Sequence, residues 1–210
     1  MAWDETWEAI FQENEWGKYP PEYVIRFVAR NWYRVPDRKA VHLLDLGCGP
    51  GACTWYMARE GFSVSSIDGS STAIRRLAQR LESEGLSAEC RVGDFTKSLP
   101  WPGNSFDGAI DNASIYANVY QDWRRALKET KRVLKFGGKL FSACFSTNTT
   151  PFNNRAFSNF VTESEVRSLY SEFFEITIDR HFVAYGDVKT DLFLVTAVNS
   201  RLDLHHELSR

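Results

Sequence analysis

The amino-acid sequence predicts an α/β fold that is built around a parallel β-sheet. Residues 41–46 form an apolar run that is typical of a short buried strand, and a helical pattern begins soon after it. The same succession of strand and helix recurs along the chain as far as residue 145. Two further strands, at residues 174–183 and 191–198, have no helix between them. Together these observations predict an α/β domain whose sheet ends in a strand hairpin.

The remaining elements are predicted from hydrophobic periodicity and from capping residues. Helices are expected where apolar residues recur every three or four positions, and strands where short apolar runs lie between turn residues. These rules predict helices at residues 52–60, 71–84 and 120–134 and strands at 63–67, 88–92, 106–110 and 140–145. We interpret residues 135–139 as a turn. Thr162 and Glu165 have the spacing of a capping box, which predicts a helix that begins there and runs to Tyr170.

Length and composition limit the classes of function. The chain has 210 residues, of which 43% are hydrophobic, so a single domain with a full core is expected. A net charge of −2 gives no overall basic surface for nucleic acid. No apolar run is long enough to span a membrane, and the N-terminus does not resemble a signal peptide. The four cysteines form no CxxC pair, which favours reduced thiols and a cytoplasmic location.

A glycine-rich loop follows the first predicted strand. Three glycines, at 47, 49 and 51, let the backbone approach a ligand closely at the start of the following helix. Their spacing also fits a dinucleotide-binding fingerprint. Asp45, two positions before Gly47, distinguishes the two possibilities, because its carboxylate would repel a pyrophosphate and attract a ligand that carries ammonium and sulfonium groups. The residues therefore favour a cationic ligand.

The run Asp45-Leu46-Gly47-Cys48-Gly49-Pro50-Gly51 resembles the first motif of the class I S-adenosylmethionine-dependent methyltransferases. The resemblance extends over residues 40–198 and is strongest to the small-molecule branch that methylates ubiquinone precursors and sterols. It implies a Rossmann-like three-layer sandwich with a seven-stranded, mostly parallel sheet and an antiparallel C-terminal hairpin. It also implies that the protein is an enzyme with S-adenosyl-L-methionine as cofactor and S-adenosyl-L-homocysteine as product.

Acidic residues end four of the predicted strands. Asp68 lies about 20 residues after the first glycine, where an acid can accept hydrogen bonds from a ribose diol. Ligands of open α/β sheets bind beyond the carboxyl ends of the strands, so we expect Asp45, Asp68, Asp94 and Asp111 on one rim. The resemblance implies that Asp94 and Phe95 contact the adenine ring of the cofactor. The cofactor-binding residues expected are Asp45, Gly47, Cys48, Gly49, Asp68, Gly69, Asp94, Phe95 and Asp111.

Three segments lie outside the predicted cofactor site. Two of them have both a structural and a functional interpretation, and the third has no functional one. Residues 1–36 contain two amphipathic helices, which are either a lid over the site or aromatic packing on the sheet, and residues 37–200 form the cofactor-binding domain. The polar and aromatic residues 146–160 form either a surface loop or a substrate-facing segment. His205 and His206 have no companion ligands at metal-binding spacing, so no metal is expected.

The expected reaction is transfer of a methyl group to a small-molecule acceptor by in-line displacement. A sulfonium is already an activated leaving group, so the enzyme mainly has to hold the acceptor close and exclude water. A general base is needed only if the acceptor must lose a proton, and Tyr116 and His181 are the candidates. Two alternatives remain at this stage: a cofactor-binding partner domain without catalysis, and an NAD(P)-dependent oxidoreductase. The sequence leaves the acceptor and the oligomeric state open.

Overall fold

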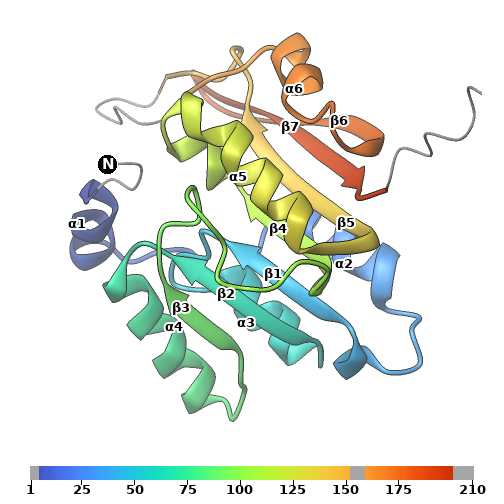
Figure 1. Cartoon of the computed structure of the whole chain (residues 1–210). Helices are drawn as coiled ribbons and strands as arrows, with labels where there is room; N and C mark the ends of the chain where they lie inside the picture. The colour runs from blue at the N-terminus through green and yellow to red at the C-terminus, as the bar shows by residue number, and fades with distance from the viewer. Residues whose placement is uncertain (1–4, 152–158, 201–210) are drawn as a thin grey trace, which may run out of the picture.

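The computed structural model of the chain, which describes residues 5–151 and 159–200, has a seven-stranded sheet at its centre (Figure 1). The strand order is β3-β2-β1-β4-β5-β7-β6, and every neighbouring pair is parallel except the pairs that involve β7. The strands are β1 (His42–Leu46), β2 (Ser63–Asp68), β3 (Glu89–Val92), β4 (Phe106–Asn112), β5 (Leu134–Phe145), β6 (Phe174–Tyr185) and β7 (Val188–Val198). The predicted Rossmann-like fold with its antiparallel C-terminal hairpin is confirmed.

Helices cover both faces of the sheet because the strand order reverses beside β1. The chain moves outward from β1 through α3 (Ala52–Arg59) and α4 (Ser71–Ser83), then returns to β4 and continues through α5 (Tyr120–Val133) in the opposite direction. Because the crossovers are right-handed, helices that connect strands in opposite directions along the sheet lie on opposite faces. Helices α5 and α6 (Glu163–Leu169) accordingly lie together in front of the sheet, and α3 lies behind it (Figure 1). Strands are added in one direction from β1 and in the other from β4. Ligands of such sheets bind at this point, where the strand order reverses.

Two hydrophobic clusters fill the space between the sheet and its helices. One cluster joins α5 and α6 to the sheet through Trp123, Leu127 and Leu169. The other joins α2 (Glu22–Trp32), α3 and α4 to the opposite face through residues such as Phe27 and Met57. Both layers are therefore anchored by buried side chains, which gives a rigid base for loops at the carboxyl ends of the strands.

Two helices precede the sheet, as the sequence predicts. Helix α1 (Thr6–Glu13) lies beside the start of α4 and apart from α2 (Figure 1). Helix α2 begins directly after Pro21 and buries Val24, Phe27 and Val28. A short 3₁₀ helix, η1 (Arg38–Ala40), leads from α2 into β1. No helix within residues 5–151 and 159–200 is long and apolar enough to cross a membrane.

Most element boundaries agree with the sequence to within a few residues, but one predicted turn is wrong. Residues 135–139 belong to β5, which begins at Leu134 and continues through them. Gly137 has a φ of +76°, and the pairing of β4 with β5 shifts between Phe106 and Gly108. The glycines therefore produce an irregularity inside a long strand instead of a separate turn. The capping box of Thr162 and Glu165 is present as predicted.

Candidate active site

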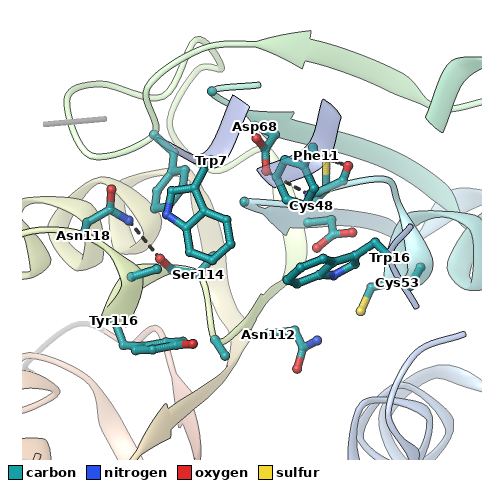
Figure 2. Close-up of a pocket in the computed structure, with 18 of the residues that line it drawn as sticks. Trp7, Phe11, Trp16, Cys48, Cys53, Asp68, Asn112, Ser114, Tyr116 and Asn118 are labelled. Atoms are coloured by element: carbon teal, nitrogen blue, oxygen red, sulfur yellow. Dashed lines mark hydrogen bonds between the residues drawn. The ribbon is translucent and has the colours of Figure 1, made fainter. Parts of the chain in front are cut away.

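A cavity of about 290 Å³ lies at the carboxyl ends of β1, β2 and β4. Figure 2 shows Trp7 and Trp16 on one side of it and Tyr116 and Asn112 on the opposite side. Its wall combines the glycine loop, the turn after β4 and side chains of the N-terminal segment. The lining residues that recur below are Trp7, Phe11, Trp16, Tyr23, Asp45, Gly47, Cys48, Gly49, Asp68, Gly69, Phe95, Asn112, Tyr116, Phe145 and Leu192.

The glycine loop connects β1 to α3 and packs tightly on its neighbours. Gly47 has a φ of +59°, and a Cβ atom placed on it would lie 2.3 Å from the Ser114 Cβ atom. A Cβ on Gly49 would lie 3.3 Å from the Phe11 ring. Side chains at these positions would separate the loop from the β4 turn or from the N-terminal helix. Glycine is thus required both for the backbone conformation and for the close approach of three segments.

Two of the predicted acids, Asp45 and Asp68, face this cavity and are almost completely buried. Asp45 is 2% exposed, and Thr54 Oγ1 donates a hydrogen bond of 2.6 Å to its Oδ2. Asp68 accepts hydrogen bonds of 2.8 Å from the backbone N–H groups of Gly49 and Ser70. Burial raises the pKa of Asp45 to about 7 and that of Asp68 to about 6. A cationic ligand beside them would lower the free energy of their ionised forms.

The two other predicted acids do not line the cavity. Asp94 Oδ1 instead accepts hydrogen bonds from the backbone and side chain of Thr96, and its Oδ2 lies 3.3 Å from Lys97 Nζ. Its neighbour Phe95 does line the cavity and is buried. Asp94 thus lies just beyond the carboxyl end of β3, on the expected rim, and its side chain closes the turn that follows. The adenine contact that the resemblance implies for Asp94 stays a prediction. Gly69 and Cys48 lie in the wall as expected.

Asp111 is a buried link between segments and not part of the cavity wall. It is 1% exposed, and its Oδ1 accepts hydrogen bonds from Ser114 N, Ser114 Oγ and Ile115 N. Ser142 Oγ donates to its other oxygen and accepts a hydrogen bond from Tyr170 Oη. Ser114 Oγ also donates to the Leu46 carbonyl. Asp111 thus lies at the carboxyl end of β4, as expected, and fixes the turn that carries Asn112 and Tyr116. Its expected contact with the cofactor stays a prediction.

The structure separates the two candidate general bases. Tyr116 lines the cavity, and its ring lies 4.6 Å from that of Phe145 between centroids. His181 lies on β6 in a different groove, which is formed with α2, and contacts the Tyr23 ring. Tyr23 lines both depressions and stands between His181 and the cavity. Only Tyr116 of this pair can therefore contact a ligand in the cavity without a rearrangement.

The N-terminal segment contributes an aromatic cluster above the glycine loop. The rings of Trp7, Phe11 and Trp16 contact one another, with centroid distances of 5.2 to 6.2 Å. Glu8 holds α1 on the start of α4, because its carboxylate accepts hydrogen bonds from Ser70 Oγ and Thr72 Oγ1. These bonds lower the pKa of Glu8 to about 2. The helical spacing of the aromatic residues is visible in the sequence, but the Glu8 contact is not, because it joins residues far apart in the chain.

Several sequence predictions fall on residues outside the described part of the chain. These are the histidines at 205 and 206, and residues 152–158 of the segment for which a substrate-facing role was considered. Trp3 of the first predicted helix is also among them. Within residues 5–151 and 159–200, no cluster of three or more histidine, cysteine or acidic side chains could hold a metal ion.

Comparison with known proteins finds similarity in the part of the chain that includes the glycine loop. The family model described as a methyltransferase domain matches residues 43–138, which contain the glycine loop, both buried acids and the turn after β4. Over these residues the chain is similar to a methyltransferase domain, as its first motif also indicates. Similar curated proteins include a trans-aconitate 2-methyltransferase of Delftia acidovorans, 34% identical over 92 residues. Another is a ubiquinone biosynthesis O-methyltransferase of Caulobacter vibrioides, 33% identical over 101 residues.

These matches cover the methyltransferase domain and only part of each relative. They include 43% and 48% of this chain but 31% and 39% of the two relatives. The chain thus spans less than half of the length of these relatives. Among solved structures, a methyltransferase of Methanosarcina mazei superimposes with a TM-score of 0.68 at 24% identity, over 87% of this chain and 99% of that chain. A methyltransferase of Burkholderia thailandensis gives 0.69 at 19% identity, over 86% and 78%. These two structures share the fold.

Proposed function

We propose that this protein is a methyltransferase, which transfers a methyl group from S-adenosylmethionine to a small-molecule acceptor. The observation that carries the proposal is the shape of the cavity, which continues from the glycine loop and its two buried acids to the turn after β4. The glycine-loop side, which we call the cofactor half, contains Asp45, Gly47, Cys48, Gly49 and Asp68. The opposite side, the acceptor half, contains Tyr23, Asn112, Tyr116, Phe145 and Leu192.

The residues of the cofactor half fit this cofactor better than a dinucleotide. Among the described residues that line the cavity, the charged side chains are those of Asp45 and Asp68, and both are acidic. A pyrophosphate would meet two carboxylates there and no compensating basic group among the described lining residues. A sulfonium, an ammonium and ribose hydroxyls are instead favourable partners for carboxylates. Gly47 and Gly49 leave the loop backbone open to close contact, which supports the same assignment.

The protein's contribution to the reaction is positioning and exclusion of water. Bound S-adenosylmethionine supplies a methyl group on an activated sulfur, so the acceptor atom bonds to carbon as the carbon–sulfur bond breaks and its electron pair stays on sulfur. The turn after β4 holds the acceptor half in place through Asp111, and the aromatic cluster of Trp7, Phe11 and Trp16 covers the cavity. These contacts preorganise the reacting atoms and keep the site dry.

Tyr116 is the side chain that we place beside the acceptor. Its hydroxyl can form a hydrogen bond with the acceptor's nucleophilic atom, and the acceptor's proton can leave through it to water. The N-terminal residues 1–36, of which 5–36 are described, act in this proposal as a lid on the domain formed by residues 37–200. All four cysteines are free thiols, which supports a reducing compartment such as the cytoplasm. With a net charge of −2, we propose no nucleic-acid partner.

The first test is thermal unfolding in the presence of S-adenosylmethionine, S-adenosylhomocysteine, NADH and NADPH. A ligand at about 100 times its dissociation constant adds roughly 2.7 kcal/mol to stability, which is visible as a higher Tm. We expect a shift with the first two ligands, and a smaller shift in Asp68→Asn. A shift with the nicotinamides alone would contradict the assignment of the cofactor half.

A further inference from the structure

The acceptor half forms one wall of a slot, and the aromatic side chains of the N-terminal segment form the other. Figure 2 shows Trp7 and Trp16 across the cavity from Tyr116 and Asn112. Tyr116 and Phe145 pack together with an interplanar angle of 58°, so the far wall presents ring surface. Leu192 of β7 adds an aliphatic contact to that wall. Apolar, polarizable walls of this kind favour contact with an aromatic ligand.

The charges around the slot are unfavourable for an acid. No lysine, arginine or histidine is among the lining residues in the described part of the chain. The charged side chains that do line the cavity, Asp45 and Asp68, would repel an anionic acceptor. An unpaired carboxylate that enters such a site loses its hydration without gaining a cationic partner. The described residues of the acceptor half therefore disfavour carboxylate substrates.

Asn112 supplies the polar group that can orient an uncharged ligand. Its Oδ1 accepts a hydrogen bond of 3.2 Å from Tyr23 Oη, and no described residue accepts one from its Nδ2. Tyr23 is itself fixed by ring contacts with Phe141 and His181, at centroid distances of 5.7 and 5.2 Å. Burial raises the pKa of Tyr23, so it remains a neutral donor. This arrangement orients the Asn112 amide and leaves its N–H₂ group as a donor for a ligand.

We infer that the acceptor half binds an uncharged aromatic compound with a nucleophilic oxygen or nitrogen, which the Asn112 amide orients. This inference rests on the proposed function and narrows its substrate class. In the transfer, the nucleophilic atom gains the methyl carbon and gives its proton to water, and the sulfur keeps the electron pair of the broken bond. His181 has an indirect place in this account, because it packs on Tyr23 and so helps to orient Asn112.

The test uses matched probes with the full chain saturated with S-adenosylhomocysteine. Naphthol is an uncharged aromatic alcohol, naphthoate has the same rings with a carboxylate, and trans-aconitate is an aliphatic anion. Binding is followed by quenching of tryptophan fluorescence, because Trp7 and Trp16 line the cavity, and by calorimetry. We expect naphthol to bind at least about tenfold more tightly than either anion, which is the effect of one unsatisfied polar contact. Equal or tighter binding of an anion, or no binding of naphthol, would overturn the inference.

Variants test the role of Asn112 separately. Asn112→Ala is expected to weaken naphthol binding by about tenfold and to leave S-adenosylhomocysteine binding unchanged. Tyr23→Phe removes the orienting hydroxyl and is expected to have a smaller effect in the same direction. Asn31→Ala is the matched control, because Asn31 lies in the other groove with Lys139. Unchanged naphthol binding in Asn112→Ala would remove Asn112 from the site. Failure of the proposed function would look different, because S-adenosylhomocysteine itself would not bind.

Discussion

The carboxylate of Glu8 accepts a hydrogen bond of 2.5 Å from the hydroxyl of Ser70, and so links the first helix to the residue that caps α4. Ser70 also donates its backbone N–H to Asp68, whose other oxygen accepts from Gly49 in the glycine loop. A short chain of hydrogen bonds therefore runs from α1 to the cofactor half of the cavity. This connection implies that the position of α1 and the binding of the cofactor depend on each other.

Removal of the Glu8 charge should loosen α1 and weaken cofactor binding. We expect Glu8→Gln to lose about 1 kcal/mol of stability, the usual value of a side chain at a helix start. If the lid must be docked, affinity for S-adenosylhomocysteine falls by up to about fivefold. Urea unfolding and calorimetry measure the two effects. Glu13→Gln on the same helix is the control, and equal behaviour of the two variants would contradict the proposed link.

The same contact has a defined pH dependence. The pKa of Glu8 is lowered to about 2 in the folded protein, from an ordinary value of 4.5. The stabilisation is therefore fully present above the ordinary value and is lost as the pH falls through about 2. The stability difference between wild type and Glu8→Gln should shrink over this acidic range. A difference that is constant from neutral pH to about pH 2 would show that the charge is not involved.

Cofactor binding should strengthen as the pH rises through neutrality. Burial raises the pKa of Asp45 to about 7, so this acid is mostly protonated in the empty site below that pH. A cationic ligand prefers the ionised carboxylate, so affinity for S-adenosylmethionine should rise about tenfold between about pH 5.5 and about pH 7.5. Calorimetry across this range measures the effect. In Asp45→Asn the rise should be smaller and should follow Asp68, whose pKa is about 6.

The empty protein should show the opposite trend in stability. The raised pKa of Asp45 means that the folded state holds a proton that the unfolded chain has already released. Stability from this group is thus present at low pH and is lost as the pH rises from 3.8 to about 7. Asp45→Asn should unfold at a Tm that is less dependent on pH over this interval. A steeper dependence in the variant would contradict the direction of the pKa shift.

Substitution of Gly47 tests the close contact between the glycine loop and the turn after β4. A Cβ at this position would lie 2.3 Å from the Ser114 Cβ, so Gly47→Ala should cost about 3 kcal/mol and abolish cofactor binding. Gly61→Ala is the matched control, because Gly61 also has a positive φ but has open space around it. The control should cost only about 1 kcal/mol of backbone strain. Urea unfolding separates steric overlap from strain.

Asp111 should matter for stability although it does not line the cavity. Asp111→Ala leaves buried donors of Ser114, Ile115 and Ser142 without their acceptor, and should cost about 3 kcal/mol. Asp187→Ala, in the exposed turn between β6 and β7, should change stability by less than about 0.5 kcal/mol. Denaturant unfolding of the two variants provides the comparison. Similar small losses would mean that the turn does not depend on Asp111.

Local patterns in the sequence are sufficient to predict most of the helices and strands. Alternation of apolar runs and amphipathic helices predicted the order of β1 to β5, and the capping box at Thr162 predicted the start of α6. The glycine loop was also predictable, because its residues are adjacent and its conformation requires them. These features depend on neighbours within one turn or one strand, so the residues themselves contain the information.

The tertiary structure decided which side chains meet in the cavity. Asp45 and Asp111 both lie near the carboxyl ends of central strands, yet only Asp45 of the two lines the cavity, because Ser114 and Ser142 enclose Asp111. Asn112 meets Tyr23 across 89 positions of the chain, and Glu8 meets Ser70 across 62. Contacts between residues so far apart in the sequence depend on how the helices pack on the sheet and on which side chains become buried there. The sequence alone therefore determined the fold and its cofactor loop, whereas packing determined the acceptor half and the docking of the first helix.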